Sequence, residues 1–221
     1  MSLPLLLTGS SEAGEVLARS GGANKEGGSA HPVSHGPPPA RREVVCFDCR
    51  TVNKASSKAT STQCANCGTF IDLRDVEVRE RTTQRIRTRG NVVVHKKGAL
   101  LGTAVHCGSL TIEGSVAGSI YAQDTVTFAT DAKVLGEIRC RRLVVDRRAK
   151  VTGLQPIHLD TMELLGELTA RVFASGTVRI ARHARMVGGL NAARLRLETG
   201  GALLAVVRVG GRAADGPGEP A

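Results

Sequence analysis

Four cysteines in two Cys-x-x-Cys pairs are the residues of this chain whose spacing suggests chemistry. Cys46 and Cys49 form the first pair, Cys64 and Cys67 form the second, and 14 residues separate the pairs. A two-residue gap lets both sulfurs of a pair face one ion, and four thiolates in a tetrahedron are the usual ligands of a structural zinc ion. The pattern therefore predicts a zinc site that leaves no position free for a substrate.

Disulfides and a redox pair are the competing interpretations of these cysteines. The residues that precede them lack the basic and apolar regions of a secretory signal, so we expect a reducing compartment, where paired motifs favour metal. We expect residues 43–74 to form a small zinc ribbon with a core of Phe47, Phe70 and Ile71. A domain of fewer than about 40 residues usually needs such a metal to fold.

A repeat of about 17 residues occupies most of the remaining chain. One apolar residue marks each copy: Leu100, Val116, Val134, Val151, Leu168, Met186 and Leu203, in steps of 16, 18, 17, 17, 18 and 17 residues. Four positions later come Ala104, Ile120, Ile138, Gln155, Val172, Leu190 and Val207, apolar in all copies but one. Within a copy apolar residues alternate, as at Val126 and Phe128, which is the period of a strand with one buried face. The repeat predicts an all-β protein whose residues 86–210 form a parallel β-helix of about seven coils.

The composition agrees with this fold. Aromatic residues make up only 2% of the chain and there are 26 glycines. A globular core normally uses aromatic side chains for buried area, whereas a narrow coil is filled by stacked aliphatic residues and bends several times per turn. Cys140 shares a column with Ala122, Ala174 and Ala192, so we interpret it as a small core residue. The register near His106 leaves Cys107 less defined.

The segments outside the ribbon and the β-helix have the composition of tails and a linker. We expect residues 1–42 and 211–221 to be disordered tails, because they carry few large apolar groups, and residues 75–85 to be a charged linker. Leu3, Leu5, Leu6 and Leu7 break this pattern. Either they belong to a disordered end, or they form a short tip that touches a membrane or a partner.

The positive charge of the chain lies mainly in the β-helix. Of the formal net charge of +10, residues 86–210 hold 18 basic against nine acidic residues. Eight basic residues are expected to form a patch: Arg141, Arg142, Arg147, Arg148, Lys150, Arg179, Arg182 and Arg185. The patch is either a solvated face or a site for lipid headgroups, cell-wall polymers or nucleic acid. The scarcity of aromatic stacking platforms argues against single-stranded nucleic acid.

No motif in the sequence predicts catalysis. A hexapeptide count typical of β-helix acyltransferases runs through Val116 to Cys140 and then fails at Asp146. Four histidines of the β-helix, His95, His106, His158 and His183, fall at different points of the coil and lack a consistent acid or nucleophile partner. We therefore expect no enzyme activity and no small-molecule substrate.

Part of the β-helix is similar to a known family. The stretch Ser109–Ala122, with Ala132-Lys-Val-Leu-Gly-Glu-Ile and Ala149-Lys-Val-Thr-Gly, resembles the bactofilins, which are polymer-forming cytoskeletal proteins. The resemblance covers roughly residues 86–210. It implies a right-handed β-helix that polymerises end to end without nucleotide, as a bacterial scaffold under the membrane for cell-wall or other morphogenetic machinery. It further implies a cytoplasmic protein, peripheral at the inner membrane where a short N-terminal motif attaches it. The zinc ribbon departs from the usual family layout and suggests an added recognition module.

The ends of the β-helix also suggest self-assembly. Solenoids normally end in polar or helical caps, and open ends that match their own kind generate filaments. The residues expected at the open ends are Val92, Val94, Leu100, Leu203, Leu204, Val206, Val207 and Val209. We therefore expect a homopolymeric scaffold that recruits partners for cell shape or envelope processes. The alternatives are a monomeric zinc-ribbon adaptor for nucleic acid or protein, and, least favoured, an acyltransferase-like enzyme.

Overall fold

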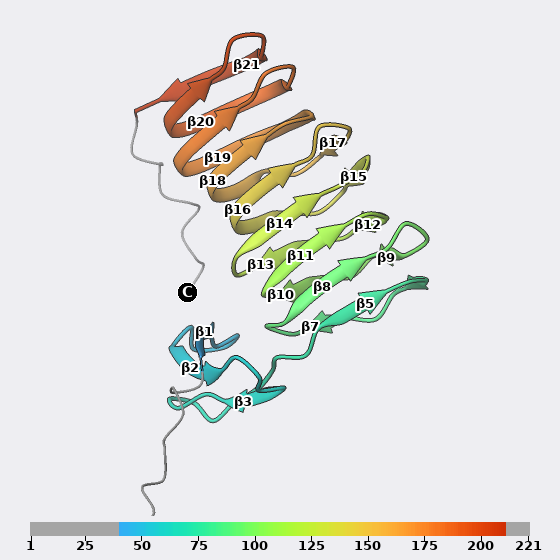
Figure 1. Cartoon of the computed structure of the whole chain (residues 1–221), viewed down its shortest axis with the longest axis vertical. Helices are drawn as coiled ribbons and strands as arrows, with labels where there is room; N and C mark the ends of the chain where they lie inside the picture. Colours follow the sequence, from blue (N-terminus) through green and yellow to red (C-terminus); the bar gives the residue numbers. More distant parts are fainter. Residues whose placement is uncertain (1–39, 211–221) are drawn as a thin grey trace, which may run out of the picture. The chain divides into compact units, whose positions relative to one another are not determined.

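The computed structural model describes residues 40–210, and all regular structure in this range is β (Figure 1). Within the same range there is no helix with the length and apolarity needed to cross a membrane. The predicted tails 1–42 and 211–221, including the N-terminal leucines, lie almost wholly outside the described residues. The predicted N-terminal tail overlaps the described residues only at 40–42, where the first strand already begins at Arg41.

Two antiparallel hairpins form the first part of the described chain. Strand β1 (Arg41–Val45) pairs with β2 (Val52–Ser56), and β3 (Ser61–Gln63) pairs with β4 (Phe70–Asp72). Each Cys-x-x-Cys pair occupies the loop of one hairpin. We call residues 40–74 the ribbon.

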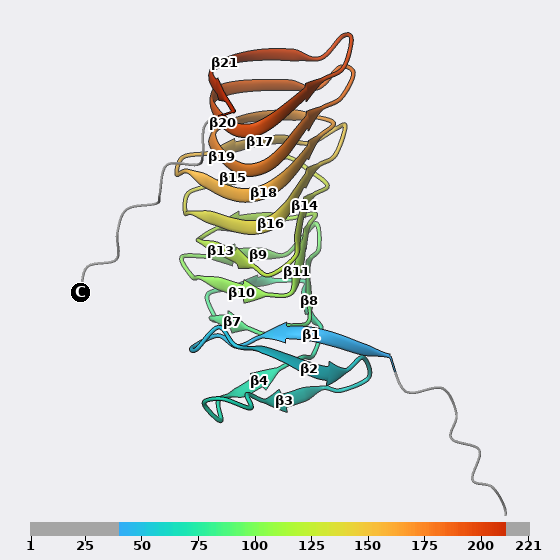
Figure 2. The same ribbon diagram turned by 90° about the vertical axis from the view of Figure 1, so that its left-hand side faces the viewer.

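The remaining strands wind into a parallel β-solenoid of about eight turns, each with three faces (Figures 1 and 2). The first face contains β5 (Val76–Val78), β8 (Asn91–Val94), β11 (Ser109–Ile112) and β14 (Thr125–Phe128). The second contains β6 (Arg81–Thr82), β9 (Ala99–Leu101), β12 (Ser115–Ala117), β15 (Ala132–Val134) and β17 (Lys150–Gly153). The third begins with β7 (Ile86–Arg87), β10 (Val105–Cys107) and β13 (Ile120–Ala122).

Later strands bend around corners and serve more than one face. They are β16 (Ile138–Val145), β18 (Ile157–Leu164), β19 (Glu167–Ile180), β20 (Arg185–Leu197) and β21 (Ala202–Val209). The strands therefore lengthen toward the C-terminal end. The last strand is eight residues long, whereas β6 and β7 of the first turn have two residues each.

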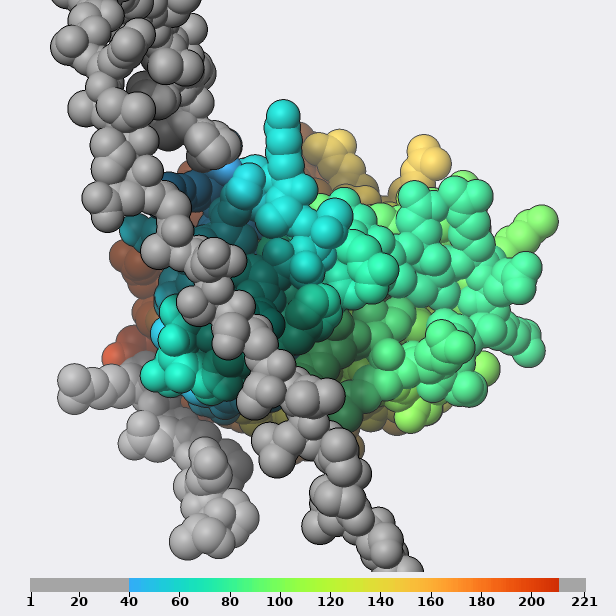
Figure 3. Space-filling model, turned by 90° about the horizontal axis from the view of Figure 1, so that it is seen from below, coloured from blue at the N-terminus to red at the C-terminus, as the bar shows by residue number. Residues whose placement is uncertain are grey.

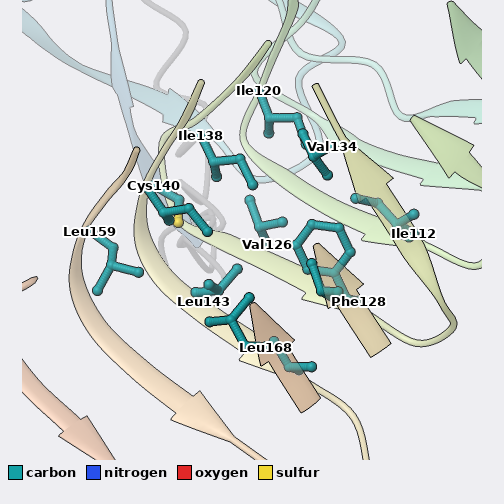
Figure 4. Close-up of a cluster of buried hydrophobic side chains, with 14 of the residues drawn as sticks. Ile112, Ile120, Val126, Phe128, Val134, Ile138, Cys140, Leu143, Leu159 and Leu168 are labelled. Carbon is teal, nitrogen blue, oxygen red and sulfur yellow. The ribbon is translucent and has the colours of Figure 1, made fainter. Parts of the chain in front are cut away.

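Stacked aliphatic side chains fill the interior, as the repeat predicts. One column of the third face consists of Ile86, Val105, Ile120, Ile138, Ile157, Val172, Leu190 and Val207. Phe128, which is completely buried, fills the corner between the first and second faces together with neighbours that include Ile112 and Val134 (Figure 4). Each side chain of the third-face column packs against its counterparts in the turns above and below. Burial of these apolar side chains stabilises the stacking of one turn on the next.

The register of two turns differs from the predicted one. Ile157, and not Gln155, takes the place in the third-face column, and Val105 replaces Ala104. Pro156 follows Gln155, and proline has no N–H to donate to a ladder, so pairing resumes beyond it. The step from Ile138 to Ile157 is long and the next step is short, so the average period hides the displacement. Because Ile157 takes the place predicted for Gln155, the third-face column is apolar in every turn.

The solenoid begins earlier than predicted. Residues 75–85, assigned to a linker from their charge, contain β5 and β6, which pair in parallel with β8 and β9. Together with β7 they form an additional first turn, which brings the number of turns to about eight instead of seven. Only Val76, Val78 and Ile86 carry the inward apolar pattern of this turn, and the charged residues between them conceal it.

Hydrogen bonding along the second face is interrupted once. The strands β6, β9 and β12 form a separate three-stranded sheet, and the ladder resumes only from β15 to β17. Between β12 and β15 the first and third faces carry the pairing. The second face therefore consists of two parts, with the break between β12 and β15.

Both cysteines of the solenoid are core residues. Cys107 pairs with Ala122, and Cys140 pairs with Leu159 in a column that continues through Ala174 and Ala192. Burial raises the pKa of each thiol to about 12. A thiol that stays protonated is neither a nucleophile nor a metal ligand, which confirms the interpretation of Cys140 and extends it to Cys107.

Candidate metal centre and assembly surfaces

The two hairpins of the ribbon present their cysteines in the same way. In the first, the N–H of Cys46 donates to the carbonyl of Thr51 (3.0 Å), and in the second the N–H of Cys64 donates to that of Thr69 (2.9 Å). The residue after each second cysteine is left-handed, Arg50 at φ 58° and Gly68 at φ 70°. The expected turn at Gly68 is therefore present, and the first loop makes the same turn with an arginine.

The four sulfurs form a compact group. All lie within 4.8 Å of one another, with 3.6 Å from Cys46 Sγ to Cys67 Sγ and 3.4 Å from Cys49 Sγ to Cys64 Sγ. Two sulfurs on one tetrahedral zinc ion, each about 2.3 Å from it, are about 3.8 Å apart. None of the four is in a disulfide. The donor set and its spacing fit one tetrahedral metal ion, as predicted.

A buried asparagine connects the two loops around the sulfurs. Asn53 donates to the carbonyl of Thr51 (2.9 Å), accepts from the N–H of Ala65 (2.9 Å) and places its Nδ2 3.6 Å from Cys64 Sγ. A residue that bonds to both loops and to a ligand orients the ligands of a metal site. Sequence inspection had no signal for this role, because it depends on the pairing of β1 with β2.

The protonation of the cysteines also suits metal binding. The hydroxyl and N–H of Thr51 lower the pKa of Cys49 to about 5, and the backbone of Cys67 lowers that of Cys64. Burial raises the pKa of Cys46. Metal ligation requires thiolates, so a site that already favours two of them loses few protons on binding.

The small core beside the sulfurs differs from the predicted one. It consists of Val44, Ala55, Ile71 and Leu73 with the sulfurs of Cys46 and Cys64. Ile71 is fully buried, as expected, but Phe70 is 61% exposed, because alternation along β4 turns it outward. Phe47 packs at the edge of this core and points toward the solenoid.

Phe47 and Asp48, the residues between the first two cysteines, hold the ribbon on the solenoid. The Phe47 ring lies against the guanidinium groups of Arg87 and Arg89, 4.6 and 4.2 Å from the ring centroid, and meets the His106 ring edge-on at 6.3 Å. The Asp48 carboxylate forms an ion pair with Arg87 and accepts a hydrogen bond from Thr69. Cation–π contacts of this kind gain strength where the cation is partly desolvated, as Arg89 is.

Main-chain contacts continue this interface. Arg89 Nε donates to the carbonyl of Val45 (2.8 Å), the N–H of Val45 donates to Gln123 Oε1 (3.2 Å), and Gln123 Nε2 donates to the carbonyl of Glu43 (3.3 Å). Strand β1 therefore lies beside the first three turns, near the ends of the third-face strands β7 and β13 (Figure 2). These contacts join residues about 45 to 80 positions apart, which no local sequence pattern could indicate.

The predicted N-terminal assembly residues are not at an end. Val92, Val94 and Leu100 are at most 1% exposed, because the additional turn β5–β7 covers them. The true first turn has short strands and many charges, among them Glu77, Arg79, Glu80 and Arg81. Its apolar residues Val78 and Ile86 are buried.

The C-terminal end is apolar and open within residues 40–210. There β21 pairs with β20 alone, and no described strand pairs with its outer edge. Val207 and Val209 continue inward columns of the core but are 37% and 51% exposed, since no further turn covers them. Leu204 and Val206 are 54% and 76% exposed and point to the flank, and Leu203 is half-buried.

Comparison with known proteins agrees with this architecture. The model of one family, described as "Bactofilin: Polymer-forming cytoskeletal", matches residues 61–155, from β3 to the fifth turn. This match and the parallel β-solenoid fold together support the bactofilin family for residues 61–155. No curated protein and no solved structure matches the chain significantly. The match begins inside the ribbon, so the second cysteine hairpin lies within the matched bactofilin region.

The basic patch of the bactofilin solenoid is partly neutralised. Arg141 pairs with Asp124, Arg142 and Arg179 share Glu163, Arg179 also pairs with Glu198, and Lys150 lies near Glu167. Among residues 40–210, Arg147, Arg148, Arg182 and Arg185 have no carboxylate within ion-pair distance. Charge counted along the sequence overstated the free charge of this surface, because the acidic partners sit one turn away in register.

The histidines of the bactofilin solenoid lie on its outer surface. His106 stacks on Tyr121 and His158 stacks on Phe173 along the third face, with ring centroids 4.9 and 5.2 Å apart. His95 lies between Glu77 and Glu113, and His183 is at a corner with φ 66°. The outward aromatic residues of the third face were not expected from the low aromatic content.

Proposed function

We propose that this bactofilin is a self-assembling cytoskeletal scaffold whose chains join through the open C-terminal end of the solenoid. The observation that carries the proposal is the bare last turn, with an eight-residue strand edge and inward valines that nothing in residues 40–210 covers. An unpaired strand edge is a template for pairing with another chain. The polymer-forming character of the matched family supports the same conclusion.

The C-terminal end of a second copy is the partner that fits this surface. Apolar residues gain by meeting apolar residues, and the first turn of the solenoid offers mostly charge. Joining two C-terminal ends makes an isologous contact, in which each residue meets its counterpart across a twofold axis. Val207 and Val209 of each copy would then complete the core columns of the other.

The ion of the ribbon is zinc in this proposal. Four thiolates in tetrahedral spacing suit zinc, and a site with all four positions filled by protein has a structural role. Purified protein is expected to contain one zinc ion per chain. We propose no catalytic residue in the solenoid. We further propose that the scaffold works in the cytoplasm, at the surface of the inner membrane, where its unpaired arginines would face anionic partners.

The assembly proposal is tested by charging the open end. Val207→Lys with Val209→Lys places two charges in the contact, whereas Leu135→Lys adds a charge at a 47% exposed position far from the end and serves as control. Sedimentation velocity with negative-stain microscopy should show wild-type and control proteins associated, and the end variant at least about tenfold weaker in association. Wild-type protein that sediments as a monomer at modest salt with its zinc bound would overturn the scaffold and leave the monomeric adaptor.

A further inference from the structure

The residues that dock the ribbon on the solenoid lie in the loop that carries the first two cysteines. Phe47 and Asp48 stand between two ligands, and Val45, which bonds to both Arg89 and Gln123, precedes the first. When the four sulfurs bind one ion, the backbone of residues 46–49 is held in one conformation. This conformation directs Phe47 and Asp48 toward the solenoid. A ribbon of about 35 residues has too small a core to keep that loop in place without its metal.

The docked ribbon occupies the N-terminal end of the solenoid. The segment 72–74 lies directly against the corner 88–90, where the N–H of Arg89 donates to the carbonyl of Asp72 (2.7 Å) and Thr88 Oγ1 donates to that of Arg74 (2.7 Å). A Cβ on Gly90 would come within 2.2 Å of the Arg74 carbonyl oxygen. Seen from this end, the ribbon lies against the first turns (Figure 3). At the corner 88–90 it stands where a further turn, or the end of a second molecule, would stack.

We propose that the ribbon is a metal-held cap on the N-terminal end of the solenoid. With the four cysteines loaded, the cap obstructs this end at the corner 88–90, and two chains join only through their C-terminal ends. Loss of the metal releases Phe47 and Asp48 from Arg87 and Arg89, and the N-terminal end becomes available to a second copy. The assembly half of this proposal rests on the proposed function.

The consequence for assembly follows from symmetry. An isologous contact at one end closes a dimer and cannot extend further. A filament needs a second contact, and the described part of the chain offers the edges of β5, β6 and β7 for it once the ribbon no longer stands at the corner 88–90 beside them. These edges are short, and their charges are of both signs, so they can pair between two copies. Metal content therefore selects between a dimer and a filament.

The first experiment separates docking from metal binding in the full chain. Phe47→Ala with Asp48→Ala removes the contacts to the solenoid but retains all four cysteines. The control is Val52→Ala with Phe70→Ala, at two ribbon residues that are 54% and 61% exposed. With one zinc ion per chain confirmed for each protein, wild type and control should sediment as dimers, and the undocked variant should form rods many subunits long.

The second experiment isolates the N-terminal contact. In a background of Val207→Lys and Val209→Lys, the metal-loaded chain should be a monomer. Adding Phe47→Ala and Asp48→Ala should turn it into a dimer, because only the N-terminal ends can meet. A monomer in this combination overturns the cap, as do long filaments of the metal-loaded wild-type chain.

Hydrogen exchange gives a readout that does not depend on assembly. Chelation of the metal should speed exchange in residues 86–90, 104–108 and 120–124 about tenfold and leave residues 157–192 unchanged. Unchanged exchange in the first three segments after complete metal removal overturns metal-held docking. If every variant stays monomeric, the scaffold function fails with the assembly half of the proposal, and the exchange result alone then decides the docking.

Discussion

The two ends of the solenoid solve the same physical problem in different ways. Each terminal turn exposes strand edges and half a core. At the N-terminal end the strands shorten to two or three residues, charges alternate with the apolar positions, and the ribbon docks on the first turns. At the C-terminal end an eight-residue apolar strand remains open. The difference teaches that this chain protects one end with its own residues and, within residues 40–210, leaves the other end uncovered.

The largest expected effect comes from removing one metal ligand. Cys64→Ser should abolish stoichiometric zinc binding, because a tetrahedral site with three thiolates loses much of a binding free energy of about 10–16 kcal/mol. Exchange should become fast throughout residues 41–72, while the turns from 138 to 209 keep their protection. A ribbon that stays protected in this variant would contradict the contrast between the ends, because its order would then not depend on metal.

Acidification should weaken the N-terminal end alone. Burial, and then the nearby charges of Arg85, Arg87 and Arg89, lower the pKa of His106, which faces Phe47 and Tyr121. A depressed histidine pKa means that the docked state favours the neutral ring. Its stabilisation is full above the ordinary pKa of about 6.5 and declines as the pH falls from there toward the folded value.

Exchange of residues 86–90 measured between pH 7.5 and 5.5, corrected for intrinsic rates, should therefore rise as the pH falls. Zinc content has to be followed in parallel, because thiol protonation also releases metal. His106→Gln removes the titration and should flatten the profile. An equally steep profile in that variant would assign the effect to the metal site.

A smaller, stabilising effect is expected at Arg50. This residue has φ 58° at the position that Gly68 occupies in the second loop. A non-glycine residue in the left-handed region costs about 1 kcal/mol relative to glycine. Arg50→Gly should therefore raise the free energy of opening of the zinc-loaded ribbon, seen as slower hydrogen exchange of residues 41–56. A decrease would show that the arginine side chain contributes more than its backbone costs.

The smallest effect should come from charging the flank of the last turn. Leu204 and Val206 point outward from β21, in contrast to Val207 and Val209. Exposed substitutions outside a contact change stability by less than about 0.5 kcal/mol. Leu204→Lys with Val206→Lys should leave both the fold and the association nearly unchanged. Loss of association in this pair would move the contact from the end of the solenoid to its side.

Much of the fold could be predicted because the repeat is visible in the spacing of apolar residues that are close in sequence. Alternating apolar residues and a period near 17 require stacked short strands, whatever the details of the corners. The third-face strand of the fifth turn was misplaced by two residues, because Pro156 interrupts pairing at a point that an average period cannot show. The first turn was missed because two-residue strands with charged neighbours carry almost no periodic signal.

The cluster of four cysteines could be predicted from the sequence, whereas the contacts of the ribbon with the solenoid could not. Spacing alone brings Cys46, Cys49, Cys64 and Cys67 together, since each pair closes its own hairpin. The contacts of Phe47 with Arg87 and Arg89 depend on how the ribbon folds back on a later part of the chain. Free charge on the solenoid was overestimated for a similar reason, because Glu163 reaches Arg142 and Arg179 only once the turns are stacked.

The interrupted second face gives the rod a mechanical weak point. Between β12 and β15 two faces carry the hydrogen bonds that three carry elsewhere. Under tension along the axis, that gap should yield before the long strands β18 to β21, separating a short metal-bearing piece from a longer one. A scaffold built from such rods would bend or break at regular intervals along its length.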